Sequence, residues 1–158
     1  MVPVDRCLIA HPSVQASTAL DTPWPDLDGV EVIASATGEV TVLDYVTVHD
    51  AGRLLNPLLA EGQVRGGLAH GAAAALFERH VWDELGNLLT GSFLDYLAPT
   101  APDLPTPTIA HRETQSQFLP LGAKGLGEGT TMSAPAAIAN AVADAIGRDD
   151  VELPFTPA

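Results

Sequence analysis

The chain has little cysteine, little positive charge and few aromatic residues, and each shortage excludes a class of protein. A single cysteine, Cys7, excludes an internal disulfide framework and every zinc pattern built on several cysteines. Seven Lys and Arg residues against twenty Asp and Glu residues give a net charge of −13. This balance argues against a nucleic-acid binder and against docking on an anionic membrane surface, since both depend on basic side chains.

Long hydrophobic runs are also missing. No apolar run approaches the ~20 residues of a membrane-spanning helix. The opening segment MVPVDRCLIAHPS lacks the apolar region of a secretory signal. With a lone cysteine, these features predict a soluble, cytoplasmic protein. The length of 158 residues suits about one domain, and the 46% hydrophobic content, although inflated by alanine, can support a core.

Fourteen glycines and thirteen prolines predict short elements joined by irregular connections. Residues 1–28 contain four prolines and are expected to form an irregular leader before a folded unit at 29–158. From Val30, the runs VEVIAS and VTVLDYVTV flank a glycine-containing turn and predict a β-hairpin. A second hairpin is expected in VWDELGNLL. TIAHRE is expected to form a strand, and the tail VELPFTPA a terminal strand.

Two segments have helix signals. Asn56 can cap free amides and Pro57 suits the first helical position, so a helix is expected from there to about Glu78. Ser133-Ala134-Pro135 is expected to open a second helix that ends at Gly147. The predicted fold class is therefore α+β, with β-hairpins packed against two main helices.

The first predicted helix contains an unusual number of glycines: Gly62, Gly66, Gly67 and Gly71. Each costs about 1 kcal/mol relative to Ala in a helix interior. Because Gly67 and Gly71 lie one turn apart, one face of the helix is almost bare backbone. We therefore expect another backbone or a ligand to pack very close to that face.

A glycine-rich loop, LGAKGLGEGTT, precedes the second predicted helix. It fits neither the P-loop nor the dinucleotide fingerprint, because its lysine and its glycines have the wrong spacing. Its acid, Glu128, lies just before a helix N-terminus, where amides favour an anionic group. Flanking glycines would let a substrate or cofactor approach this carboxylate closely, although a solvated loop acid has the same pattern.

Other polar residues have several interpretations. Gln63 could bind a ligand lying over the bare helix face or satisfy local backbone. Lys124, the sole lysine, could pair with Glu128, contact a phosphate or point into solvent. His49 and Asp50 end the second strand, where turn formation or core packing explains them as well as a site edge. The scattered histidines argue against a histidine metal site.

Three segments in order resemble one family. The run VTVHDAGRLLNPLLAEGQVRGGLAHGAAAALFE is similar to part of the molybdopterin-binding large subunit of the xanthine dehydrogenase/aldehyde oxidase family. The segments LTGSFLDYLAPTAPDLP and PLGAKGLGEGTTMSAPAAIANAVADAIG are similar to the parts that follow. The resemblance covers the chain from about Val30 onward. It points to the C-terminal portion of that subunit, in the subgroup of carbon monoxide dehydrogenase.

The resemblance implies a chemistry. Enzymes of the family hydroxylate an aldehyde, an N-heterocycle or a related substrate with water as the oxygen source. Glu128 matches the glutamate of the family's GxGE loop, which acts as general base on the attacking hydroxyl group. Gln63 matches the glutamine of the EGQ motif, which contacts the pterin. Four loop residues adjoin the cofactor by the same comparison: Lys124, Gly125, Leu126 and Gly127.

The resemblance also implies partners. The cofactor would be molybdopterin, as the mononucleotide or the cytosine dinucleotide, with no protein side chain coordinating the metal. A flat pterin and a neighbouring chain would lie close to the bare helix face. Iron–sulfur clusters and FAD would belong to partner chains.

Because the chain is much shorter than the family's large subunit, it would act as a fragment or split subunit completed by the remaining portion. The alternatives are a non-catalytic remnant serving at most in interaction or assembly, and a small anion-binding module built on the 122–133 loop.

Overall fold

A computed structural model describes residues 8–9, 27–34, 37–148 and 150–156. Most of the expected leader, including Cys7, lies outside the described residues. Two short parts of it do not: Leu8–Ile9 forms strand β1, and strand β2 already begins at Leu27. β1 pairs antiparallel with β2, so this piece of the leader belongs to the sheet rather than to an irregular arm.

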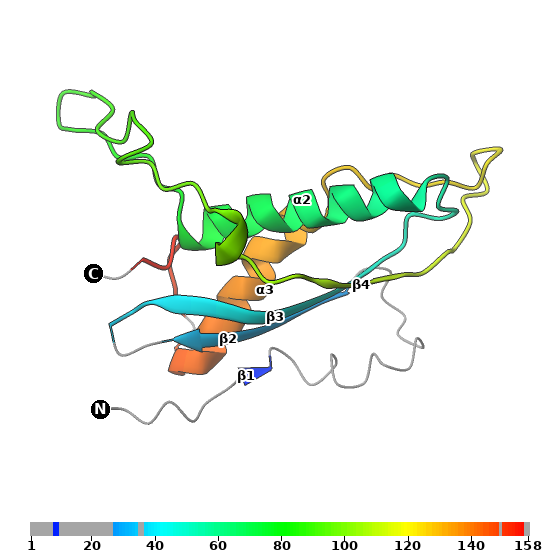
Figure 1. The fold of residues 1–158 in the computed structure, drawn as a ribbon, viewed down its shortest axis with the longest axis horizontal. Helices are drawn as coiled ribbons and strands as arrows, with labels where there is room; N and C mark the ends of the chain where they lie inside the picture. The colour runs from blue at the N-terminus through cyan, green and yellow to red at the C-terminus, as the bar shows by residue number, and fades with distance from the viewer. Residues whose placement is uncertain (1–7, 10–26, 35–36, 149, 157–158) are drawn as a thin grey trace.

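The fold is a four-stranded sheet in the order β1-β2-β3-β4 with two main helices (Figure 1). β2 spans Leu27–Ala34 and β3 spans Val40–His49, and the two form the predicted antiparallel hairpin. β4, Thr108–His111, confirms the strand expected in TIAHRE and runs parallel to β3. The long helices are α2, Pro57–Leu76, and α3, Gly129–Ile146. The predicted α+β class is confirmed.

A bulge in the hairpin decides which side chains of β3 face the helices. Val42 pairs with Val32 while Asp44 pairs with Glu31, so Leu43 is an extra residue on β3. An extra residue reverses the alternation of side chains along a strand. Val42 is buried before the bulge, and Tyr45, Thr47 and His49 are buried after it. His49 therefore points inward at the end of the strand.

α2 begins as the sequence predicts. The side chain of Asn56 accepts a hydrogen bond from the Leu59 amide at 3.2 Å, and Pro57 occupies the first turn. The helix ends at Leu76, two residues before the expected Glu78. Most of its buried residues recur every three or four positions, which is the spacing of one helical face: Ala60, Val64, Gly67, Leu68, Gly71, Ala72, Ala75 and Leu76. Ala73, off this spacing, is buried as well.

The expected start of the second helix is wrong. α3 begins at Gly129, and Pro135 lies inside it. Proline has no amide to donate to the carbonyl four residues earlier in the helix. Its ring packs on Gly71 of α2, where a Cβ would lie 2.9 Å from Cδ of Pro135. The Ser133 hydroxyl donates at 3.4 Å to the carbonyls of Gly129 and Thr130. The expected end is confirmed, since Gly147 has the left-handed φ of 67° that suits a helix C-terminus.

The bare face of α2 packs against α3 of the same chain. A Cβ on Gly67 would lie 2.8 Å from Cβ of Thr130, and a Cβ on Gly71 would lie 2.5 Å from Cβ of Ala134. The predicted close backbone neighbour is confirmed as α3, which leaves no room for the expected pterin at these two positions. Of the residues that meet these two glycines, Thr130 and Thr131 were expected in the loop, whereas Ala134 and Pro135 were expected at the start of the second helix.

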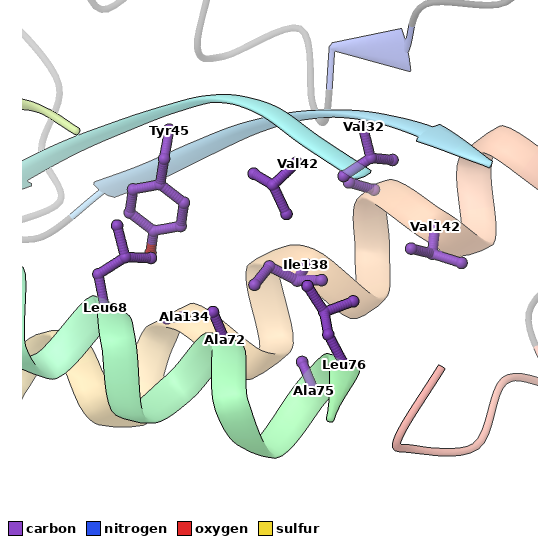
Figure 2. Close-up of a cluster of buried hydrophobic side chains, with 11 residues drawn as sticks. Val32, Val42, Tyr45, Leu68, Ala72, Ala75, Leu76, Ala134, Ile138 and Val142 are labelled. Atoms are coloured by element: carbon purple, nitrogen blue, oxygen red, sulfur yellow. The ribbon is translucent and has the colours of Figure 1, made fainter. Parts of the chain in front are cut away.

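The core lies between the sheet and both helices. α3 packs against β2, and α2 lies across α3 (Figure 1). Val32, Val42 and Tyr45 of the sheet point toward apolar side chains of the two helices (Figure 2). The helices contribute Leu68, Ala72, Ala75 and Leu76 from α2, and Ala134, Ile138, Ala141 and Val142 from α3.

The connections are mostly irregular. Trp82 pairs with Leu88 in a small antiparallel bridge, which confirms the second predicted hairpin. A short 3₁₀ helix, η1, spans Ala101–Asp103 within the proline-rich connection. In the described residues the C-terminal tail forms no strand, contrary to expectation. Instead the Phe155 amide donates to the Ala75 carbonyl at 2.8 Å, and the partly buried ring packs against the core.

Candidate functional site

The end of β3 lies against the start of α3. The ring nitrogen Nε2 of buried His49 is 2.9 Å from the hydroxyl of Thr47 and 2.9 Å from the hydroxyl of Thr130. Thr130 is the second residue of α3 and is also buried. His49 thus joins the sheet to the first turn of the helix, and the packing interpretation of this histidine is confirmed.

Asp50 follows His49 and connects three segments. Its Oδ1 accepts from the amides of Gly52 at 2.9 Å and Thr114 at 3.1 Å. Its Oδ2 accepts from Nζ of Lys124 at 2.9 Å and from the Thr114 hydroxyl. Burial raises the pKa of the Asp50 carboxyl, but the hydrogen bonds from Thr114 and Lys124 outweigh that effect and hold it far below its usual range. Lys124 therefore pairs with Asp50 rather than with Glu128 or solvent alone.

The glycine loop is paired with the segment after β3. The Arg53 amide donates to the Gly122 carbonyl at 3.0 Å, and the Lys124 amide donates to the Ala51 carbonyl at 2.8 Å. Gly52 has a φ of 61°, and a Cβ there would lie 2.3 Å from the Gly122 oxygen. Only glycine can bring the two backbones this close.

Gln63 reaches the same loop from α2. Its side-chain amide donates to the Gly127 carbonyl at 3.3 Å. Glu128, the next residue, is the N-cap of α3, and its side chain makes no capping hydrogen bond. Both side chains are exposed on this chain. The fold therefore brings Gln63, the glycine loop and Glu128 together on one surface.

The middle of the loop has polar groups without partners. In the part of the chain that the structure describes, the amides of Gly125, Leu126 and Gly127 donate to no protein acceptor. A Cβ on Gly125 or Gly127 would meet nothing within 4 Å. Unpartnered amides beside a helix N-terminus suit an anionic or hydrogen-bond-accepting group, and the missing side chains let it approach.

The contacts of Asp50 with Thr114 and Lys124 were not predicted from the sequence. A carboxylate two residues before Gly52 and a single lysine were the available signals, but pairing across 74 positions is not readable from spacing. Within the described residues, no group of three or more His, Cys, Asp and Glu side chains could hold a metal ion. No described helix combines the length and apolar character needed to cross a bilayer.

Comparison with known proteins identifies the family. A family model described as a molybdopterin cofactor-binding domain matches residues 29–105. The nicotine 6-hydroxylase large subunit of Paenarthrobacter nicotinovorans is 41% identical over 155 residues, covering 93% of this chain and 19% of that subunit. The chain belongs to the xanthine dehydrogenase/aldehyde oxidase family of molybdopterin-binding subunits.

Other members of this family agree. The carbon monoxide dehydrogenase large chain of Hydrogenophaga pseudoflava is 36% identical over 78% of this chain and 16% of its own. The structure of quinoline 2-oxidoreductase from Pseudomonas putida 86 superposes with a TM-score of 0.74 at 40% identity, over 76% of this chain and 15% of that one. The predicted resemblance is confirmed. The chain spans about a fifth or less of the length of these relatives, which are named as a large subunit and a large chain.

Proposed function

We propose that residues 29–158 are the C-terminal portion of a molybdenum hydroxylase large subunit, which oxidises an aldehyde or an N-heterocycle with water as the oxygen source. The main support for this proposal is that Gln63, the 124–127 loop and Glu128 lie on one surface, where the Gln63 side chain donates a hydrogen bond to the Gly127 carbonyl. In this proposal Glu128 is the general base and Gln63 contacts the pterin.

The loop fits a pterin cofactor. Its three unpartnered amides can donate to polar atoms of the pterin or its phosphate, and its open glycines leave space for a flat ring system. The Nζ and amide of Lys124 both have protein partners, so Lys124 adjoins the cofactor mainly by anchoring the loop. When bound, molybdopterin would supply the metal that accepts the substrate's electrons. The proposed form is the mononucleotide or the cytosine dinucleotide.

An exposed carboxylate needs the rest of the enzyme to become an effective base. Glu128 must accept a proton within about 3 Å of the attacking hydroxyl group. A dry pocket would raise its pKa toward neutrality. The chain spans about a fifth of the length of a relative. We therefore propose that the remaining portion of the large subunit closes the pocket, with iron–sulfur and flavin subunits completing a cytoplasmic enzyme.

Exposed apolar side chains support the proposal that another polypeptide packs on this chain. Residues 80–97, here called the arm, project away from the helices (Figure 1). The arm is locally ordered by the Asp83–Asn87 turn and by His80 lying 4.9 Å from the ring of Tyr96. It nevertheless exposes Phe93 at 91% and Leu94 at 87%. Exposed apolar clusters of this kind mark interaction surfaces.

The sheet edge gives the same indication. Among the described strands, β4 is the last in the order and has a neighbour on one side only. Both ring nitrogens of His111, in β4, are buried without a hydrogen-bond partner. An edge strand leaves backbone N–H and C=O groups available for pairing, so another polypeptide beside β4 would extend the sheet.

Co-purification from the native host tests the proposal directly. We expect the chain to be recovered with a protein containing the remaining large-subunit portion, and with molybdenum and a pterin detected in the same complex. The chain purified alone should show no turnover of aldehydes or N-heterocycles. Robust turnover by the chain alone would contradict the split enzyme. Recovery without partner, molybdenum or pterin would instead support the non-catalytic remnant.

A double substitution on the arm tests the docking surface. Phe93→Ser with Leu94→Ser should weaken recovery of the partner about tenfold or more, because two anchors would be lost from the contact. The change should leave the fold intact, since both side chains are exposed. Ile146→Ser, at an exposed apolar position at the end of α3, serves as the control. Unchanged recovery of the partner with the doubly substituted arm would remove the arm from the interface.

A further inference from the structure

The Asp50 carboxylate lies where three segments meet. It receives hydrogen bonds from the segment after β3 through Gly52, from the segment after β4 through Thr114, and from the glycine loop through Lys124. The side chain of Asp50 is 3% exposed, and that of Lys124 is 35% exposed. A carboxylate so enclosed needs its charged partner, because an unpaired charge is costly to bury.

The loop between this ion pair and α3 is held at both ends. At Lys124, the side chain bonds to Asp50 and the amide bonds to the Ala51 carbonyl. At the other end, His49 contacts Thr130 in the first turn of α3. Between the two ends, the Gln63 amide donates to the Gly127 carbonyl and the Ser133 hydroxyl donates to the Gly129 carbonyl. The position of Glu128 therefore depends on these fixed ends.

We propose that Asp50 is a positioning residue that, through Lys124, fixes the loop presenting Glu128 and the cofactor-facing amides. The role of Glu128 as general base rests on the proposed function, but the role of Asp50 in holding the loop does not. Asp50 and His49 are neighbours at the C-terminal end of β3. The same strand end therefore holds the loop at Lys124, through Asp50, and at Thr130, through His49. A shift of the loop would move the base relative to its proton, and small misplacements reduce turnover strongly.

Hydrogen exchange of the full chain, measured alone and in any complex in which it is recovered, tests this role. Lys124→Met removes the ammonium and should speed exchange about tenfold or more at the amides that hold the loop, because a hydrogen bond to a charged group is lost. The reporter amides are those of Arg53, Ser116 and Lys124, which bond to Gly122, Gly122 and Ala51. Amides in the middle of α2 should keep their wild-type rates.

Two further variants separate positioning from a general effect. Lys124→Arg retains the charge and should restore slow exchange. Arg148→Met removes another cation from an exposed ion pair, with Asp150 at 2.8 Å, and should leave the loop unchanged. The positioning role is wrong if Lys124→Met leaves the exchange rates of the reporter amides unchanged, or if Arg148→Met raises those rates equally.

Asp50→Asn provides a second, independent variant. The amide keeps one oxygen acceptor but places a donor against Lys124 or Thr114, so we expect the same local pattern of faster exchange. In the assembled enzyme, both variants should lower kcat about tenfold or more with KM nearly unchanged, because the base is displaced while substrate contacts remain. Should Glu128 prove not to be the base, the exchange measurements would still decide the role of Asp50. A higher KM with unchanged kcat and unchanged exchange rates would overturn the positioning role of Asp50.

Discussion

Glu128→Gln is expected to abolish most turnover of the assembled enzyme while leaving its molybdenum and pterin content unchanged. The amide has nearly the same shape as the acid but cannot accept the proton, and general-base catalysis typically contributes about 10²–10⁴-fold. The substitution should not disturb the fold, since the Glu128 side chain is exposed and makes no capping hydrogen bond. Steady-state kinetics with metal and cofactor analysis of the same sample would measure both quantities.

Two companion variants sharpen this result. Glu128→Asp keeps an acid but shortens it by one methylene, so we expect turnover between those of wild type and Glu128→Gln. Glu152→Gln makes the same charge change at an exposed position in the tail and should be as active as wild type. Turnover close to wild type in Glu128→Gln would eliminate Glu128 as the base. Loss of cofactor together with activity would assign it a binding role instead.

Gly71→Ala is expected to destabilise the fold by about 2 kcal/mol or more. The new methyl group would lie 2.5 Å from Cβ of Ala134 and 2.9 Å from Cδ of Pro135, so the two helices would have to separate. Overpacking of this kind costs typically about 1–3 kcal/mol, more than the gain in helix propensity. Urea unfolding followed by circular dichroism would show a lower midpoint with a similar slope.

Gly66→Ala is the matched control on the same helix. A Cβ on Gly66 meets nothing within 4 Å, so only helix propensity changes and stability should rise by up to about 1 kcal/mol. The two Gly→Ala changes should therefore have opposite signs. Equal effects would mean that α2 and α3 do not pack as closely as the structure has them.

The sequence predicted the features that depend on neighbouring residues. The cap at Asn56, the left-handed Gly147 and the hairpin of β2 and β3 each have local signals, and each is confirmed. The need for a close neighbour at Gly67 and Gly71 was also readable, because two glycines one turn apart leave a bare face.

The features that the sequence could not predict join residues far apart in the chain. The start of α3 was misplaced because Pro135 resembles a first helical residue, and its contact with Gly71 of α2 is visible only in the structure. The ion pair of Asp50 and Lys124 depends on the sheet and on the loop meeting, and no local pattern encodes that meeting. At the site, the resemblance named Gln63 and Glu128, while the structure added the strand end that holds the loop.

The parallel pairing of β3 and β4 has a consequence for the order in which the molecule assembles. The two strands are neighbours in the sheet, yet α2, the arm and η1 all lie between them in the sequence. Bringing β3 and β4 together closes a long loop, and its entropic cost must be met before the strand pairing can compensate it. Pairings between residues far apart in the sequence also slow folding. Thr114 reaches Asp50 only once β4 has docked, so we expect the surface of Gln63, the glycine loop and Glu128 to form last, after the hairpin and the helices have packed together.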